Sequence, residues 1–263
     1  MLITSKDNEK IKHVKKLKEK KYREEFNEFI VEGIKMVQEA INERADIKTI
    51  LISDSVNVKE NFPSEFMYEI ARYECIYVAE KIFQQISDVI NPQGIMAIVA
   101  KKNTSVSEID FDEENFLILD NIQDPGNMGT IIRTADSLNM KQIIVSKGSA
   151  DIYNTKVVRS TMGAIFRVRV IESENLVDTI RLLKNHGVKI FATDLATDKS
   201  IYDVDYSQAA IVIGNEANGV SKEVLDEASI RIKIPMIGKT ESLNAAVATS
   251  VLLYHAFHDT GKI

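Results

Sequence analysis

The stretch FLILDNIQDPGNMGTIIRTADS (residues 116–137) decides the fold of this chain. Its apolar run stops abruptly at Asp120, and a cluster of turn-forming residues follows at 124–127. A helical pattern with one apolar face then runs over 127–138, with Asn127 in the position of a helix cap. A strand, a tight turn and a helix in this order form the repeating unit of an α/β protein.

The same alternation continues through the second half of the chain. Strands are predicted at 116–119, 142–146, 166–171, 188–193, 210–213 and 230–234, and helices at 127–138, 156–165, 174–186, 220–228 and 243–258. Because the strands are continuous apolar runs, they indicate a mostly parallel sheet covered by helices on both faces. Ligands collect at the carboxyl ends of the strands in open sheets of this type.

The first half predicts a smaller α/β domain. Strand patterns at 47–53, 75–79 and 95–101 alternate with helical patterns at 5–22, 32–43, 64–73 and 80–90. The polar stretch 101–115 has few core-type residues and is expected to be the linker. We therefore expect one domain over residues 1–105 and a second over residues 106–263.

The composition is typical of a globular protein, with 263 residues, 44% of them apolar and 27% charged. The single Cys75 excludes an internal disulfide framework and a multi-cysteine metal cluster. His255 and His258 lie one turn apart without a third ligand at usable spacing, so we expect no metal site. We also expect a cytoplasmic protein without membrane contact, because neither a signal-peptide core nor a run of ~20 apolar residues is found.

The charge is unevenly distributed along the chain. The formal net charge is −6, which by itself argues against a nucleic-acid partner. Residues 1–24, however, hold nine Lys or Arg against four Asp or Glu, a local charge of +5 that leaves −11 for the remainder. A basic arm of this kind is compatible with phosphate contacts, and it is equally compatible with a solvated helix face.

Arg133 belongs to the helical pattern that follows the opening turn. It lies two residues from Ile131, about 200° round the helix at ~100° per residue, and therefore points away from the core. On spacing alone, Arg133 is compatible with an ordinary surface arginine and Asn127 with an ordinary cap.

A second turn with unusual residue types lies in IVIGNEANGVSKEVLD (211–226). Gly214 and Gly219 flank Glu216 directly after a strand, and glycines there allow a ligand to approach the backbone closely. The spacing is not the dinucleotide fingerprint, because Glu216 takes the place of the middle glycine. A plain strand–turn–helix connection capped by Ser221 also fits, although an acid at a buried strand end needs a partner.

The third stretch is IPMIGKTESLNAAVATSVLLYHAF (234–257). Ser242 and Asn244 stand at the head of its helix, where unpaired backbone N–H groups point outward, and one of them is expected to be the N-cap. The helix itself is apolar on nearly every side, which requires burial inside the fold or against a second copy of the chain.

These three stretches, in this order, resemble the three motifs of the SpoU/TrmH family, the RNA 2′-O-ribose methyltransferases of the SPOUT class. The motifs N-x-G-x-x-x-R, I-G-x-E-x-x-G and I-P-M-x-G-x-x-x-S-L-N correspond here to Asn127, Gly129 and Arg133; to Ile213, Gly214, Glu216 and Gly219; and to Ile234 through Asn244. The resemblance covers about residues 116–258. Residues 26–100 resemble the L30e-like substrate-binding domain that is often attached upstream.

The resemblance implies a C-terminal SPOUT domain with a deep trefoil knot and a homodimer whose active site lies close to the subunit interface. It implies RNA as substrate and S-adenosylmethionine as methyl donor, without a metal. Catalytic roles would fall to Arg133, Asn127, Glu216, Ser242 and Asn244. Donor binding would fall to Ile213, Gly214, Gly219, Ile234, Met236, Gly238 and Leu243.

The separate N-terminal domain and the basic arm favour ribosomal RNA, 23S rRNA above all, as the substrate, with tRNA as the alternative. A non-catalytic, ribosome-associated RNA-binding protein is a second hypothesis, which the complete set of polar motif residues disfavours. A third is a SPOUT enzyme that methylates a base, although such enzymes usually lack this pairing of the first and third motifs.

Overall fold

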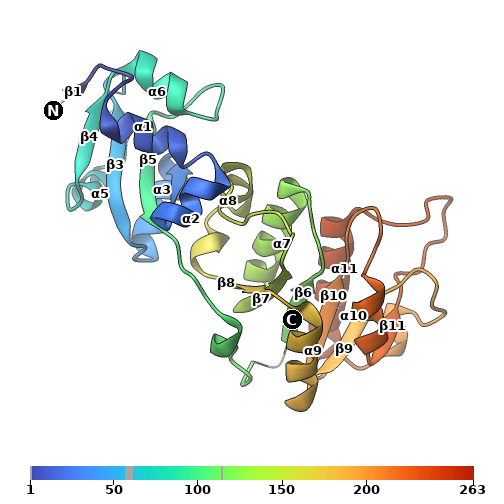
Figure 1. Cartoon of the computed structure of the whole chain (residues 1–263). Coiled ribbons are helices and arrows are strands. Elements are labelled where there is room, and N and C mark those ends of the chain that lie inside the picture. The colour runs from blue at the N-terminus through green and yellow to red at the C-terminus, as the bar shows by residue number, and fades with distance from the viewer. Residues whose placement is uncertain (1, 57–61, 114) are drawn as a thin grey trace. The chain divides into compact units, whose positions relative to one another are not determined.

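The computed structural model describes residues 2–56, 62–113 and 115–263, and the chain folds into two compact units (Figure 1). The first unit holds the residues up to Lys102 together with Asp151–Phe166. The second holds Asn103–Ala150 and Arg167–Ile263. The first passage from one unit to the other thus lies within the stretch 101–115 that was expected to be a linker, of which Glu114 is outside the described residues.

The first unit is built on a five-stranded sheet. Its strands are β1 (Leu2–Ile3), β2 (Glu28–Glu32), β3 (Ile47–Ser53), β4 (Cys75–Val78) and β5 (Ile95–Ala100), in the order β1-β4-β3-β5-β2. β1, β4 and β3 run parallel, whereas β5 is antiparallel to both β3 and β2. The sequence patterns identify three of these strands and miss β1 and β2, because β1 has two residues and β2 lies between two helical patterns.

The helices of the first unit differ from the prediction near the start of the chain. The single helix expected over 5–22 is wrong, because the chain turns at Leu17 and forms two helices. The helices are α1 (Glu9–Lys16), α2 (Lys20–Phe26), α3 (Ile34–Asn42), α5 (Ser64–Ile70) and α6 (Glu80–Ile86). Ile11, Val14 and Leu17 are fully buried in one cluster with residues of β3 and β5, as their spacing predicts.

Residues 151–166 return to the first unit, although the sequence analysis assigns their helical pattern to the second domain. They form α8 (Thr155–Thr161) and the 3₁₀ turn η2 (Ala164–Phe166). Tyr153 and Phe166 are buried in the core cluster that contains Phe29, and the rings of Phe29 and Tyr153 lie 4.7 Å apart. The segment belongs to this unit because its aromatic residues are buried there.

The second unit is built on a six-stranded, entirely parallel sheet. Its strands are β6 (Asn115–Leu119), β7 (Gln142–Ser146), β8 (Arg169–Ser173), β9 (Lys189–Thr193), β10 (Ala209–Ile213) and β11 (Ile230–Ile232), in the order β11-β9-β10-β6-β7-β8. The prediction of a parallel sheet is confirmed. The register pairs Leu119 with Ile213, so the loops that follow β6 and β10 start side by side.

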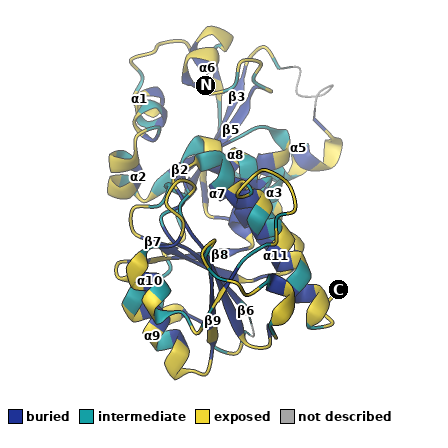
Figure 2. Cartoon of the chain, turned by 90° about the vertical axis from the view of Figure 1, so that its right-hand side faces the viewer, coloured by how far each residue is buried: buried dark blue, intermediate teal, exposed yellow. Residues whose placement is uncertain are grey.

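Helices cover both faces of this sheet, and the strands between them are buried (Figure 2). The helices are α7 (Pro125–Ser137), α9 (Leu176–Asn185), α10 (Lys222–Glu227) and α11 (Ala245–Asp259), with short 3₁₀ turns η1 (Val106–Glu108) and η3 (Ile201–Asp203). α9 and α10 pack together on one face, and α7 and α11 pack together on the other (Figures 1 and 2).

α11 is buried on one side only. Ala245, Thr249 and Leu252 face the interior, as the small and apolar sequence predicts. Val247, Val251 and Tyr254 remain 49%, 38% and 48% exposed, and their spacing of four and three residues places them on one stripe.

Among the described helices, none has the length and apolar character needed to cross a membrane.

Candidate active site

The first loop of the site follows β6 and leads into α7. α7 begins at Pro125, and its N-cap is Asp124, whose side chain accepts a hydrogen bond from Asn127 N (2.8 Å). The expectation that Asn127 caps this helix is therefore wrong. Proline suits the first helical position because it has no N–H to satisfy, and the aspartate side chain satisfies one free N–H group, that of Asn127. The side chain of Asn127 is left available for other partners.

The Asn127 amide joins three segments that lie far apart in the sequence. Its Nδ2 donates to Glu216 Oε1 (3.0 Å) in the loop after β10. Its Oδ1 accepts from Asn244 Nδ2 (2.9 Å) at the start of α11. Asn244 is also the N-cap of α11, since its Oδ1 accepts from the N–H groups of Ala246 and Val247. Of the two candidates at the head of this helix, Asn244 rather than Ser242 is the cap.

Glu216 receives hydrogen bonds from three residues of the opening turn. Its carboxylate accepts from Gln123 N (3.2 Å), Asp124 N (3.1 Å) and Asn127 Nδ2. Partial burial acts to raise the pKa of Glu216, but the hydrogen bonds from Asn127 and from backbone N–H groups outweigh it, and the pKa lies below its ordinary value. The carboxylate is therefore ionised at neutral pH and holds the two loops together.

Two further side chains, which the sequence analysis does not single out, connect the same loops. Asp120 is buried at the end of β6, and its Oδ2 accepts from Ser221 N (2.7 Å). Asn215 donates from Nδ2 to the carbonyl of Asn121 (2.8 Å). The signal for Asp120 was present in the sequence, because an acid directly after a buried strand needs a hydrogen-bond donor.

A cavity of about 330 Å³ lies beside this network, at the carboxyl ends of β9, β10 and β11. Its volume is within the range of small-molecule sites, and its location is the one expected for an open parallel sheet. Of the residues predicted to bind a donor, six line the cavity and Gly238 does not. The six are Ile213, Gly214, Gly219, Ile234, Met236 and Leu243.

The predicted catalytic residues divide between the cavity and its surroundings. Glu216 and Ser242 line the cavity, whereas Asn127, Asn244 and Arg133 are outside its lining. Arg133 is exposed on α7, as its position in the helix predicts. Within the described part of the chain, no hydrogen bond or ion pair is formed by the Arg133 guanidinium, so it remains available to an anion.

The end of β9 contributes residues that the sequence analysis does not single out. Asp194 and Leu195 line the cavity, and so does Glu241 from the segment before α11. The Asp194 carboxylate forms an ion pair with Arg231 (3.4 Å). The cavity therefore combines apolar walls with three carboxylates and one cation, Lys233, an arrangement suited to an amphipathic ligand that carries charged groups.

Gly214 is needed where the loop after β10 closes on itself. A Cβ atom built at this position would lie 2.1 Å from the backbone of Gly219 and Val220. Asn215 and Gly219 exchange two backbone hydrogen bonds of 2.9 Å across the turn.

Among the described residues, no group of three or more His, Cys, Asp or Glu side chains is arranged to hold a metal ion.

Two family models match this chain. The model of the SpoU rRNA Methylase family covers residues 114–254, and that of the MRM3-like substrate binding domain covers residues 8–97. A relative from Bacillus subtilis (strain 168) is named 23S rRNA (guanosine(2553)-2′-O)-methyltransferase RlmP. It is 34% identical over 254 residues, which are 96% of this chain and 98% of the relative.

Solved structures of similar proteins share both the fold and the order of domains. An AdoMet-bound rRNA methyltransferase from Sinorhizobium meliloti has a TM-score of 0.86 at 31% identity, over 98% of this chain and 97% of that one. The SpoU methyltransferase AviRb from Streptomyces viridochromogenes, in complex with AdoMet, also has a TM-score of 0.86, at 26% identity over 96% of this chain and 98% of that one.

Substituting Gly214→Ala is expected to destabilise the second unit, because the new methyl group must displace backbone rather than a flexible side chain. Overpacking of this kind costs about 1–3 kcal/mol, at times more. Gly238→Ala is the matched control: nothing lies within 4 Å of its Cβ position, and a change within about 0.5 kcal/mol is expected. Chemical denaturation of both variants measures the difference, and equal stabilities would contradict the packing described for the turn.

The hydrogen bonds of Glu216 predict a pH dependence of stability. Because folding lowers its pKa, the carboxylate contributes stability above the ordinary value of 4.5, and the contribution is lost as the pH falls through the lowered pKa. Glu216→Gln removes this titration. The stability difference between parent and variant should stay constant from about pH 7 to 5.5 and shrink below about pH 4.5. A difference that grows on acidification would show that the sign is wrong.

Proposed function

We propose a function on the premise that this chain belongs to the SpoU rRNA methylase family, whose model spans more than half of its residues. The chain transfers a methyl group from S-adenosylmethionine to a ribose 2′-hydroxyl of structured RNA, above all 23S rRNA. The observation that carries the proposal is the hydrogen-bonded set of Glu216, Asn127 and Asn244 beside a cavity of about 330 Å³. tRNA remains the alternative substrate.

The cavity suits the methyl donor in size and in chemistry. S-adenosylmethionine combines a flat adenine with a sulfonium and an amino-acid group. Ile213, Ile234 and Leu243 offer apolar walls to the ring system, and the acids Asp194 and Glu216 provide negative charge near a cationic ligand. Support comes from the two similar structures that contain AdoMet.

The reaction needs alignment more than chemical activation. The bond between sulfur and the methyl carbon breaks as a bond from the ribose oxygen forms, a neutral thioether leaves, and the hydroxyl releases its proton. Holding the reacting atoms in line lowers a barrier by about 7–11 kcal/mol at best. Asn127 and Asn244 orient the ribose, Ser242 donates a hydrogen bond near the reacting oxygen, and Glu216 keeps Asn127 in place.

Arg133 acts on the RNA rather than on the donor. A guanidinium offers only N–H donors and no acceptor, so Arg133 is unsuited to take a proton as a general base. We assign it the binding of an RNA phosphate and the stabilisation of negative charge on the attacking oxygen, with that phosphate or water accepting the proton. Its exposed position on α7, without an ion-pair partner in the parts of the chain that the structure describes, is consistent with this role.

A homodimer would cover the exposed stripe of α11. Val247, Val251 and Tyr254 present apolar surface to solvent, next to α7, with which α11 packs. Thr130 and Arg133 lie on the exposed side of α7, three residues apart. A dimer formed through these two helices places Arg133 at the subunit interface.

The remaining proposals concern the RNA, the knot and the compartment. The match of residues 8–97 to a substrate-binding domain supports recognition of a large RNA, and the relative named as a 23S rRNA methyltransferase spans almost the whole chain.

We propose a trefoil knot around the tight turn at Gly214, as implied by the likeness to SpoU structures. A cytoplasmic location follows from an rRNA substrate. A base-methylating or non-catalytic protein is the competing hypothesis.

Incubation with tritiated S-adenosylmethionine and separated rRNA or tRNA tests the activity. The parent protein should label a ribose 2′-oxygen of rRNA, and Arg133→Ala should lower the rate by about 10²–10³-fold while donor affinity stays within about twofold, since only charge stabilisation on the RNA side is removed. Arg181→Ala is the control, because this exposed arginine on α9 pairs with Glu227 and lies outside the cavity.

Three outcomes of the labelling experiment and of donor titration by calorimetry would contradict the proposal in different ways. Label on a base would identify a base methyltransferase. Failure of the parent to bind the donor in calorimetry would favour a non-catalytic RNA-binding protein. An Arg133→Ala variant as active as Arg181→Ala would refute the role of Arg133 and leave the reaction itself in place.

Val251→Glu tests the dimer. A carboxylate in the middle of the apolar stripe should dissociate the dimer, because an unpaired charge at a buried interface is strongly unfavourable. Sedimentation velocity at micromolar concentration compares this variant with Ile90→Glu, which places the same charge at an exposed apolar residue of the first unit. A parent that is already monomeric, or a Val251→Glu variant that remains dimeric, excludes this interface.

A further inference from the structure

Residues 151–166, here called the coupling segment, are anchored in the first unit although residues on both sides belong to the second. Tyr153 is one anchor. Its hydroxyl donates to the carbonyl of Lys102 (2.7 Å) and accepts from the N–H of the same residue (3.1 Å), and Lys102 is the last residue of the first unit before the chain leaves it. Burial raises the pKa of Tyr153 to about 12, so the hydroxyl keeps its proton.

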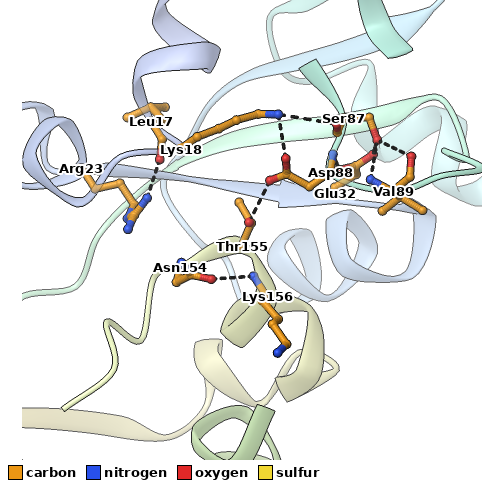
Figure 3. Close-up of polar contacts among 10 residues, drawn as sticks. All are labelled: Leu17, Lys18, Arg23, Glu32, Ser87, Asp88, Val89, Asn154, Thr155 and Lys156. Atoms are coloured by element: carbon orange, nitrogen blue, oxygen red, sulfur yellow. Dashed lines mark hydrogen bonds and ion pairs between the residues drawn. The ribbon is translucent and has the colours of Figure 1, made fainter. Parts of the chain in front are cut away.

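A buried ion pair is the second anchor. Arg23 of α2 donates from Nε (2.9 Å) and Nη2 (2.6 Å) to one oxygen of Asp151, and the two side chains are only 3% and 15% exposed. Its Nη1 donates to the carbonyl of Leu17 (2.8 Å), at the corner between α1 and α2. Figure 3 shows this guanidinium turned toward Leu17.

A third anchor lies at the start of α8. Asp88 accepts from Thr155 Oγ1 (2.8 Å) and from Lys18 Nζ (2.7 Å), so its carboxylate bridges the coupling segment and the corner between α1 and α2 (Figure 3). Arg23 is therefore occupied by this segment and Lys18 by Asp88, whereas the lysines at positions 12, 16, 20 and 21 are exposed on α1 and α2.

The residue just before the coupling segment is bound within the active-site unit. Ala150 N donates to the carbonyl of Ile122 (2.7 Å), which immediately precedes the two N–H groups that hold Glu216. Ser146 reinforces the same turn by accepting from Asn121 N (2.7 Å). One peptide bond, between Ala150 and Asp151, thus separates a contact of the catalytic loop from the buried partner of Arg23.

We propose that Arg23 and Asp151 form a positioning pair that couples RNA contact on α1 and α2 to the geometry of the catalytic loop 121–124. The RNA part of this inference rests on the proposed function. RNA phosphates that bind the exposed lysines displace the corner between α1 and α2 at Leu17. Arg23 connects this corner to Asp151, because its guanidinium donates to both. Asp151 in turn sets where Ala150 holds Ile122, and with it the N–H donors of Glu216.

Energetics favour positioning over stability as the role of the pair. Burying two charges costs desolvation that their attraction often fails to exceed, and apolar residues of similar volume can be equally stable there. An arginine that donates from two nitrogens to one carboxylate fixes the orientation of both side chains. Asp151 uses its other oxygen to accept from Tyr153 N (2.9 Å), so the start of the coupling segment is oriented as well.

Hydrogen–deuterium exchange in the full-length protein tests the coupling without requiring turnover. The variant is Arg23→Met combined with Asp151→Asn, which removes both charges and keeps an acceptor for Tyr153 N. Amides of 121–124 should exchange about tenfold faster than in the parent. Lys10→Met combined with Glu74→Gln is the matched control, because it removes an exposed ion pair of the same unit that is remote in sequence from the coupling segment, and it should leave these amides within about twofold.

Kinetics provide the second readout. Single-turnover methyl transfer at saturating RNA should fall about tenfold in the Arg23/Asp151 variant, while donor affinity and RNA affinity stay within about twofold, since no side chain assigned to either ligand has changed. A purely structural role would instead weaken RNA binding and leave the saturated rate unchanged. Parent-like exchange in 121–124 of a variant whose β3 and β5 amides remain protected would overturn the coupling.

If that variant does not keep β3 and β5 protected, Arg23→Lys takes its place, because it retains the charge but loses the two-nitrogen contact with Asp151. The same faster exchange is expected, and parent-like exchange overturns the inference equally. A parent that transfers no methyl group to any RNA would refute the proposed function, and the exchange measurement would still decide the coupling.

Discussion

The site depends on one carboxylate with three donors. Glu216 accepts from two consecutive backbone N–H groups and from Asn127, and Asn127 in turn accepts from Asn244. These bonds hold the loop after β6, the loop after β10 and the start of α11 in one arrangement. A charge-assisted hydrogen bond contributes about 1.5–3 kcal/mol at most, and less where it is exposed. The network is therefore better understood as fixing geometry than as stabilising the fold.

The parallel sheet makes this network possible. Pairing of Leu119 with Ile213 brings the two loops to the same edge, where Asp120 and Asn215 add hydrogen bonds between them. The apolar strands thereby position polar groups that could not hold one another in water. The cavity lies next to the network for the same reason, since the strands β9, β10 and β11 end there.

Local patterns predict much of this arrangement and fail at identifiable points. Continuous apolar runs predict all six strands of the second unit, and helical spacing correctly predicts that Arg133 faces outward. The same reasoning makes Asn127 the cap of α7, because asparagine caps helices well and its actual partner is 89 residues away in the sequence. A residue that suits a local role and a distant role equally cannot be assigned by local pattern alone. The coupling segment was misassigned for a related reason, since its helical pattern does not say which core buries it.

The placement of the residues to which we assign catalytic roles has a consequence for how the proposed site works. Glu216 and Ser242 face the cavity, whereas Arg133 stands outside it on an exposed helix face beside the apolar stripe of α11. Under the proposed function, a single subunit therefore holds the methyl donor in a preformed cavity and leaves the charge-stabilising group, Arg133, on its surface. The guanidinium has no protein anion to bind within the described residues, and under the proposed function an RNA phosphate supplies its partner. If Arg133 has this role, the reactive arrangement is complete only when the substrate is bound, and methyl transfer is restricted to RNA that places a phosphate beside the target ribose.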